Sequence, residues 1–237
     1  MSDVIALWSA PRARSTAFFR CMVERDDLTA LHEPFCNLID YGETTVGDDV
    51  VSSDHQLLAA IRRLSARRPV FFKDTTDYRY PAVLDDDRFL REVRHAFLIR
   101  HPAEIAASYY ALKPDMCATD IGLEYMHELY RAVRDRGGRA VVLDSDDLAR
   151  RPAETMAAYC AAVGLPARPD TLSWQPGRRA EWERSERWHA STSNSSGFTS
   201  ESTAYPATVR NNVMLAGFSD RAEPFYRALH ADRLVIG

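Results

Sequence analysis

The chain has 237 residues, of which 46% are hydrophobic and 27% are charged, and its formal net charge is −4. This composition is typical of a globular protein and excludes a disordered one. The acidic balance argues against a nucleic-acid partner, because general nucleic-acid binders are basic. A chain of this length buries one sizeable core, so we expect a single domain over residues 1–237.

Nothing in the sequence predicts a membrane anchor or export. No apolar stretch approaches the ~20 residues that a membrane-spanning helix needs, and the chain starts with an apolar strand pattern instead of a signal-peptide pattern. The four cysteines, Cys21, Cys36, Cys117 and Cys160, show no metal-ligand spacing and no close pairs. We therefore expect a cytoplasmic protein with no bound metal, no membrane partner and reduced cysteines in core or boundary positions.

Strand and helix patterns alternate along the chain. Short apolar runs predict strands at residues 4–8, 28–31, 70–73, 96–99 and 140–143. Helical patterns follow near residues 16–25, 54–67, 81–93, 102–111, 120–136 and 152–163. This alternation favours an α/β fold with a central parallel sheet of about five strands flanked by helices.

Two stretches show neither pattern. Residues 36–53 are rich in Gly, Thr and Asp, so we expect a lid or a substrate loop there. Residues 187–205 contain a run of Ser, Thr and Asn, and a structureless stretch of this length is usually either functional or disordered. We expect residues 167–237 to be helical, with a flexible flap near residues 187–205.

The first chemical motif joins the first strand to the first helix. Residues 9–16 read Ser-Ala-Pro-Arg-Ala-Arg-Ser-Thr. A helix N-terminus binds phosphate or sulfate through its unpaired backbone N–H groups, and Arg12 and Arg14 can add forked hydrogen bonds to oxyanions. The segment lacks the glycines and the lysine of a Walker A loop. The alternative is an ordinary turn in which Ser15 or Thr16 caps the helix.

A second motif follows the strand at residues 96–99. Arg100 lies at the carboxyl end of this strand, Pro102 is well placed to start a helix, and Ser108 comes about two turns later. In an open parallel sheet, ligands bind outside the carboxyl ends of the strands. We therefore expect both basic motifs at the same edge of the sheet.

Together these motifs resemble those of the sulfotransferases that use 3′-phosphoadenosine 5′-phosphosulfate (PAPS), bacterial small-molecule enzymes with a P-loop-like fold among them. Residues 141–166 add a third likeness: a strand, an acidic turn ending in Leu148, a helix started by Pro152 and a closing Gly-Leu-Pro. The resemblance implies that Arg100 and Ser108 hold the 3′-phosphate. It also implies a set of residues that hold the 5′-phosphosulfate, namely Pro11, Arg12, Ala13, Arg14, Ser15 and Thr16.

The chain departs from the family pattern in several places. The common cytosolic version of the first loop has Lys where this chain has Arg12, and Gly where it has Arg14. The aromatic residue that often stacks on adenine is replaced by Ala17, and the segment that supplies a catalytic histidine in many members reads Lys-Asp-Thr at residues 73–75. The adenine contact and the catalytic base therefore remain open.

Sulfuryl transfer needs a base beside the acceptor and positive charge beside the leaving phosphate. The resemblance assigns the positive charge to Arg12. Glu33 is a candidate base, because it follows the second strand in a Glu-Pro context similar to that of several bacterial and carbohydrate-type members, and Pro34 restricts its backbone. The alternative for Glu33 is a hydrogen bond within the loop only.

Residues 73–77 hold the rival candidates. Asp74 and Asp77 follow the third strand, and Lys73 is placed to touch the transferring sulfuryl group or the acceptor. The alternative for this cluster is a solvated turn. Within residues 187–205, Arg187, His189, Ser196 and Gly197 are the candidates for closing the nucleotide site.

We therefore expect an enzyme that transfers a sulfuryl group from PAPS to a hydroxyl or amine of a small-molecule acceptor. The product of the donor is 3′-phosphoadenosine 5′-phosphate (PAP). The alternatives are an ATP-dependent P-loop-like phosphotransferase and a non-catalytic nucleotide-binding relative. Magnesium dependence and preference for a 3′-phosphate separate these possibilities, whereas the sequence names neither the acceptor nor the oligomeric state.

Overall fold

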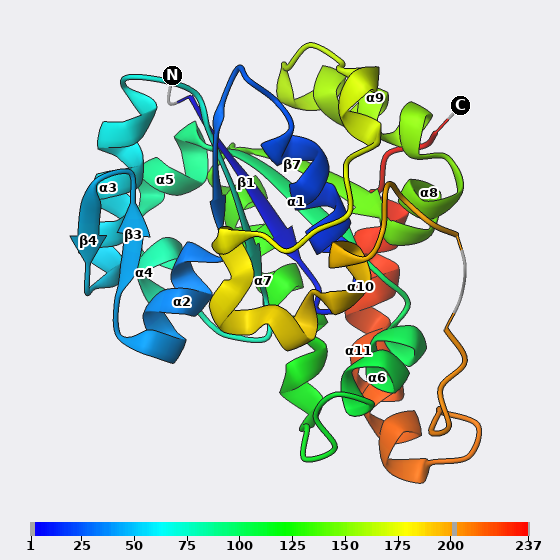
Figure 1. Ribbon diagram of the computed structural model, residues 1–237. Helices are drawn as coiled ribbons and strands as arrows, with labels where there is room; N and C mark the ends of the chain where they lie inside the picture. The colour runs from blue at the N-terminus through cyan, green and yellow to red at the C-terminus, as the bar shows by residue number, and fades with distance from the viewer. Residues whose placement is uncertain (1–2, 201–202, 237) are drawn as a thin grey trace.

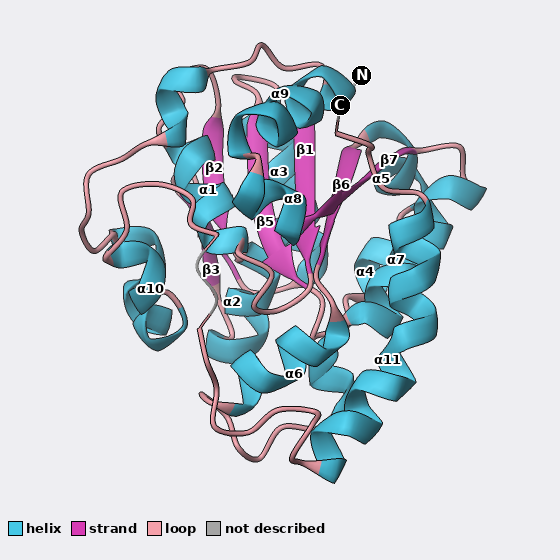
Figure 2. Ribbon diagram, turned by 90° about the vertical axis from the view of Figure 1, so that its right-hand side faces the viewer, coloured by secondary structure: helices cyan, strands magenta, loops and turns pink. Residues whose placement is uncertain are grey.

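The centre of the molecule is a five-stranded sheet in which every neighbouring pair of strands is parallel. The computed structural model describes residues 3–200 and 203–236. Figure 1 shows the whole fold, coloured by residue number along the chain. The order of the strands is β2-β5-β1-β6-β7, as the strand labels in Figure 2 show. Their bounds are β1 (Val4–Ser9), β2 (Thr29–His32), β5 (Val70–Thr75), β6 (Arg94–Ile99) and β7 (Arg139–Asp144). The α/β fold and all five predicted strands are confirmed.

The central strand is buried along its whole length because helices cover both faces of the sheet. Every residue of β1 is buried, which is typical of a parallel strand between two helical layers. In Figure 2, α1 (Ser15–Val23) and α9 (Pro152–Val163) lie in front of the sheet, and α3 (Asp54–Ser65) lies behind it. Each connection therefore carries the chain back to the opposite edge of the sheet, so that all five strands end at the same edge.

The remaining helices complete the two layers and the C-terminal part. They are α2 (Pro34–Tyr41), α4 (Pro81–Leu84), α5 (Asp87–Glu92), α6 (Pro102–Tyr110), α7 (Leu123–Asp135), α8 (Ser145–Arg150), α10 (Ala190–Ser193) and α11 (Val213–Ala231). Three 3-10 helices are η1 (Ala118–Ile121), η2 (Pro169–Leu172) and η3 (Ala180–Trp188). No helix in residues 3–200 and 203–236 is long and apolar enough to cross a membrane.

The expectation of a loop at residues 36–53 was wrong. Pro34 starts α2, which runs on to Tyr41 and ends at Gly42 in the left-handed conformation, with φ 76°. The chain then forms the antiparallel hairpin of β3 (Thr44–Val46) and β4 (Asp49–Val51). The glycines that suggested an irregular loop are a helix end and a hairpin turn.

Two further expectations need correction. The helix expected at residues 81–93 is divided into α4 and α5, because the side chain of Asp86 accepts the backbone N–H of Phe89 at 2.9 Å and starts a new helix. Of the four cysteines, all free, Cys117 is exposed, whereas the other three are buried. Part of the expected flap, residues 201–202, lies outside the described residues.

Candidate active site

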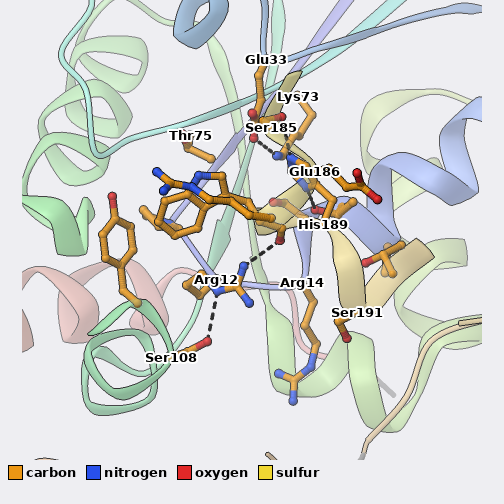
Figure 3. Close-up of a pocket in the computed structure, with 18 of the residues that line it drawn as sticks. Arg12, Arg14, Glu33, Lys73, Thr75, Ser108, Ser185, Glu186, His189 and Ser191 are labelled. Atoms are coloured by element: carbon orange, nitrogen blue, oxygen red, sulfur yellow. Dashed lines mark hydrogen bonds and ion pairs between the residues drawn. The ribbon is translucent and has the colours of Figure 1, made fainter. Parts of the chain in front are cut away.

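A cavity of about 840 Å³ opens at the carboxyl ends of β1, β2, β5 and β6. Figure 3 shows Arg12 and Ser108 at one end of this pocket and Glu33 and Lys73 at the other. The pocket is lined by most of the predicted site residues, which are Pro11, Arg12, Arg14, Ser15, Thr16, Glu33, Lys73, Arg100 and Ser108. Ala13 and Asp74 are fully buried and do not line it.

The backbone of the pocket is unusual at three positions. Among the described residues, the only non-glycine residues with positive φ are Arg12 (62°), Arg14 (62°) and Glu33 (47°), and all three line the pocket. A left-handed conformation costs a non-glycine residue ~1–3 kcal/mol and is found preferentially at functional sites. The strain is therefore concentrated in the two segments that the sequence singled out.

The loop after β1 presents an uncapped helix. Arg14 occupies the N-cap position of α1 and makes no side-chain capping bond, so neither Ser15 nor Thr16 acts as the cap considered above. The backbone N–H groups of the first turn of a helix have no partner within the helix. They remain available to an anion bound at this end of the pocket.

Arg12 and Ser108 meet although they are far apart in the sequence. Nε of Arg12 donates to Oγ of Ser108 at 3.1 Å, and Nη1 of Arg12 donates to the carbonyl of Trp188 at 2.8 Å. The hydroxyl of Tyr205 also donates to Oγ of Ser108, at 2.8 Å. Burial lowers the pKa of Arg12 from its ordinary value. The β1 loop, α6 and the flap thus converge on one serine.

Arg100, which directly follows β6, binds the same loop. Its Nη1 donates to the backbone carbonyl of Arg12 at 2.7 Å, and its Nε donates to Glu104 at 2.7 Å. The guanidinium therefore lies beside the Arg12–Ser108 pair and adds positive charge there. The two motifs on separate strands form one basic end of the pocket.

The other end of the pocket holds a buried ion pair. Nζ of Lys73, at the end of β5, donates to Oε1 of Glu33, directly after β2. Burial alone would raise the pKa of Glu33, but the charge of Lys73 outweighs it and lowers that pKa to about 2. Glu33 is therefore ionised at neutral pH and faces the cavity beside a cation.

Asp74 lies behind the site, and this differs from its expected place as a rival base. Its carboxylate accepts the backbone N–H groups of Phe35 at 2.7 Å and Cys36 at 3.2 Å, and the hydroxyl of Tyr80 at 3.1 Å. Burial and the nearby charge of Glu33 raise the pKa of Asp74 to about 7. Asp74 holds the first turn of α2 and thereby the backbone that carries Glu33.

Two carboxylate–phenol pairs form the remaining wall. The hydroxyl of Tyr109 donates to Asp77 at 3.2 Å, and the hydroxyl of Tyr78 donates to Asp40 at 2.6 Å. All four residues line the pocket. This wall offers aromatic rings and acceptor oxygens to a small molecule bound beside Glu33.

The C-terminal segment supplies both predicted and unpredicted residues to the pocket. His189 bonds through Nδ1 to the Thr16 hydroxyl at 2.8 Å and through Nε2 to the Ser185 hydroxyl at 3.1 Å. The ring of Trp188 packs against Tyr109, with 5.1 Å between the centroids. Of the four flap candidates, Arg187, His189 and Gly197 line the pocket and Ser196 does not. Tyr205 also lines the pocket; it lies at the end of the expected flap but was not among the candidates.

A family model described as a sulfotransferase domain matches residues 3–233. Branched-chain-amino-acid aminotransferase-like proteins 2 and 1 of Arabidopsis thaliana are 27% and 26% identical to this chain, in alignments that cover 87% of its length. The match covers 38% of each plant protein, so the chain spans about two fifths of the length of these curated relatives.

Two solved structures have a similar fold. The sulfotransferase domain of the Synechococcus PCC 7002 olefin synthase is 16% identical with a TM-score of 0.53, over 92% of this chain and 94% of that one. A sulfotransferase from Alicyclobacillus acidocaldarius is 13% identical with a TM-score of 0.56, over 99% of this chain and 97% of that one. At these identities the likeness shows a shared fold.

Proposed function

The chain belongs to the sulfotransferase domain family, and from this membership we propose that it transfers a sulfuryl group from PAPS to a hydroxyl or amine of a small-molecule acceptor. In this reaction the bond between sulfur and the phosphate oxygen breaks, and a bond from sulfur to the acceptor atom forms. The acceptor loses a proton, and PAP leaves. The observation that carries the proposal is one pocket with a basic end and an ionised carboxylate at the other end.

The basic end fits a nucleotide with two separate phosphate groups. The first turn of α1, with Arg12, Ser15 and Thr16, is placed to hold the 5′-phosphosulfate by backbone and side-chain donors. Arg100, directly after β6, and Ser108, in α6, would hold the 3′-phosphate, and their shared contacts with Arg12 support this role. Arg12 touches Ser108 and lies between the two groups, where it can stabilise the charge that develops on the leaving phosphate.

The opposite end supplies the proton acceptor. Glu33 is ionised at neutral pH, and its carboxylate accepts the acceptor's proton as the new bond to sulfur forms. Lys73 keeps the carboxylate oriented through the ion pair. Asp74 acts on the reaction by holding the first turn of α2.

Calorimetric titration with PAP and with AMP, both without metal, tests the donor site. A charge-assisted hydrogen bond to a phosphate contributes about 1.5–3 kcal/mol, so PAP should bind at least ~10-fold more tightly than AMP. Ser108→Ala should reduce this preference, and Ser65→Ala in α3, outside the pocket, should leave it unchanged. Equal affinities for PAP and AMP, or tight binding of ATP only with Mg²⁺, would contradict the proposal and favour a phosphotransferase.

A further inference from the structure

Two histidines lie beside Glu33 at the inner end of the pocket. His32 precedes Glu33 at the end of β2, and His189 comes from the start of α10. Metal-ligand atoms of His32, Glu33 and His189 all lie within 4.8 Å of one another. Figure 3 shows Glu33 and His189 on the same side of the pocket, with Ser185 and Lys73 between them.

His32 has no hydrogen-bond partner for its ring. Its side chain is only 2% exposed, and neither Nδ1 nor Nε2 makes a hydrogen bond to any part of the chain that the structure describes. Phe19 and Trp182 pack against the ring. Burying two polar atoms without partners is costly, and each such case in a folded protein needs an explanation.

We propose that His32, Glu33 and His189 form a binding site for Zn²⁺. Two imidazoles and one carboxylate form a donor set that suits Zn²⁺. Mg²⁺ and Ca²⁺ instead prefer sites made of oxygen ligands alone. Three protein ligands leave the fourth position of a tetrahedral ion open toward the cavity.

The side chains of His32, Glu33 and His189 need to move only slightly to bind one Zn²⁺ together. Ligands of a tetrahedral ion at bond lengths of ~2.1 Å lie ~3.4 Å apart, against a largest separation of 4.8 Å here. His189 would bind through one ring nitrogen and keep the hydroxyl of Thr16 or Ser185 on the other, which fixes the ring orientation. Nδ1 of His32 already lies 3.9 Å from Oε2 of Glu33, while Lys73 occupies Oε1.

Occupancy of this site has a consequence for the proposed reaction. A zinc ion on Oε2 of Glu33 removes the lone pair that would accept the acceptor's proton, so Zn²⁺ should inhibit sulfuryl transfer. This consequence rests on the proposed function, whereas the binding itself does not. The two are therefore tested by different measurements.

Binding is tested with Zn²⁺ alone by calorimetry and with Co²⁺ alone by visible absorption, on untagged protein. Every variant carries Cys117→Ser, because Cys117 is exposed and can bind metal itself. The background protein should bind one Zn²⁺ per chain and give Co²⁺ absorption bands of tetrahedral coordination. His32→Phe keeps an aromatic ring against Phe19 and Trp182 and should weaken Zn²⁺ binding at least ~10-fold.

Controls separate this site from adventitious binding and from misfolding. His55→Phe, at an exposed histidine of α3, should bind Zn²⁺ like the background protein. His189→Gln tests a second ligand if His32→Phe does not fold, as judged by circular dichroism in chelator. Equal Zn²⁺ affinity in the background protein and in the folded ligand variant, or Co²⁺ without these bands, would overturn the proposal. A background protein that binds Zn²⁺ but does not bind PAP would instead overturn the proposed function and leave the zinc site standing.

Discussion

Arg12 joins more parts of the pocket than any other residue described above. It holds the hydroxyl of Ser108 and the carbonyl of Trp188, and Arg100 donates to its own carbonyl. Its backbone is held in the left-handed region, a conformation that non-glycine residues adopt preferentially at functional sites. A planar fork of donors at this position suits an oxyanion better than a lysine would.

Arg12→Lys should therefore reduce turnover much more than nucleotide affinity. The substitution keeps the charge and removes the forked geometry, and loss of one well-placed donor to a developing oxyanion costs about 10²–10³ in rate. The measurement is kcat with PAPS and PAP affinity by calorimetry, with the exposed Arg67→Lys as a control. Near-normal turnover in Arg12→Lys would reduce Arg12 to a structural role in the loop.

Glu33→Gln and Asp74→Asn should fail in different ways. Glu33→Gln removes the proton acceptor and should lower kcat about 10²–10⁴-fold with PAP binding intact. Asp74→Asn leaves a buried backbone N–H facing an amide NH₂, and an unsatisfied buried donor costs about 1–3 kcal/mol of stability.

The two variants are compared by kcat and by the free energy of unfolding in urea. Asp74→Asn should show the larger loss of stability. It should also show the smaller loss of kcat, when kcat is calculated from the concentration of folded protein. A smaller loss of kcat in Glu33→Gln than in Asp74→Asn would contradict Glu33 as the base.

At the scale of elements, the packing between η1 and the β1 loop depends on one glycine. Gly122 joins η1 to α7 with φ 78°, and a Cβ atom there would lie 2.8 Å from Cδ of Pro11 and 2.9 Å from Oγ1 of Thr76. Real Cβ atoms essentially never approach so closely. The start of α7 therefore packs closely against the β1 loop at Pro11.

Gly122→Ala should destabilise the fold and also weaken PAP binding, because the added methyl group displaces Pro11. Gly137→Ala is the matched control: its φ is also positive, at 74°, and nothing lies within 4 Å of the added Cβ. The control should show only the cost of the left-handed conformation, ~1–3 kcal/mol. Equal losses of stability and unchanged PAP affinity in both variants would show that Pro11 adapts.

The elements also show how far the sequence predicts this site. The β1 loop, Arg100 and Ser108 were predictable, because each follows a strong strand or helix pattern at the carboxyl edge of a parallel sheet. The place of Asp74 was not predictable. Its partners Phe35 and Cys36 are about 40 residues away in the sequence. They belong to α2, and the nearby glycines Gly42 and Gly47 suggested a loop in this region instead of a helix. Such long-range hydrogen bonds leave no periodic trace in a sequence.

At the scale of the whole molecule, stability in acid should depend on His95, a histidine of β6 that lies beside the central strand β1. Nε1 of Trp8 donates to Nδ1 of His95 at 3.0 Å, and His95 is fully buried. Burial lowers the pKa of His95 to about 4 from its ordinary value of 6.5. Below pH 6.5 the unfolded chain takes up a proton that the folded chain refuses, so stability falls as pH drops from 6.5 toward 4.

The expected effect is measured by urea unfolding at pH 7 and pH 5. One group with this pKa shift removes about 2 kcal/mol of stability between pH 7 and pH 5. His95→Gln should therefore lose less stability than the wild type over this interval, by about that amount, and the exposed His55→Gln should behave like the wild type. Parallel losses in wild type and His95→Gln would contradict a neutral buried His95.

The contacts of Trp188 and Tyr205 have a kinetic consequence. The carbonyl of Trp188 occupies a donor of Arg12 that a phosphate of the proposed donor would need. The hydroxyl of Tyr205 lies against the Ser108 hydroxyl, where the other phosphate would have to approach. Binding then requires a prior opening step, and the apparent affinity is lower than the intrinsic one by the fraction of open molecules. The observed association rate of PAP should level off at high concentration at the opening rate. Removing one hydroxyl, in Tyr205→Phe, should raise that ceiling and tighten binding without adding any contact to the nucleotide.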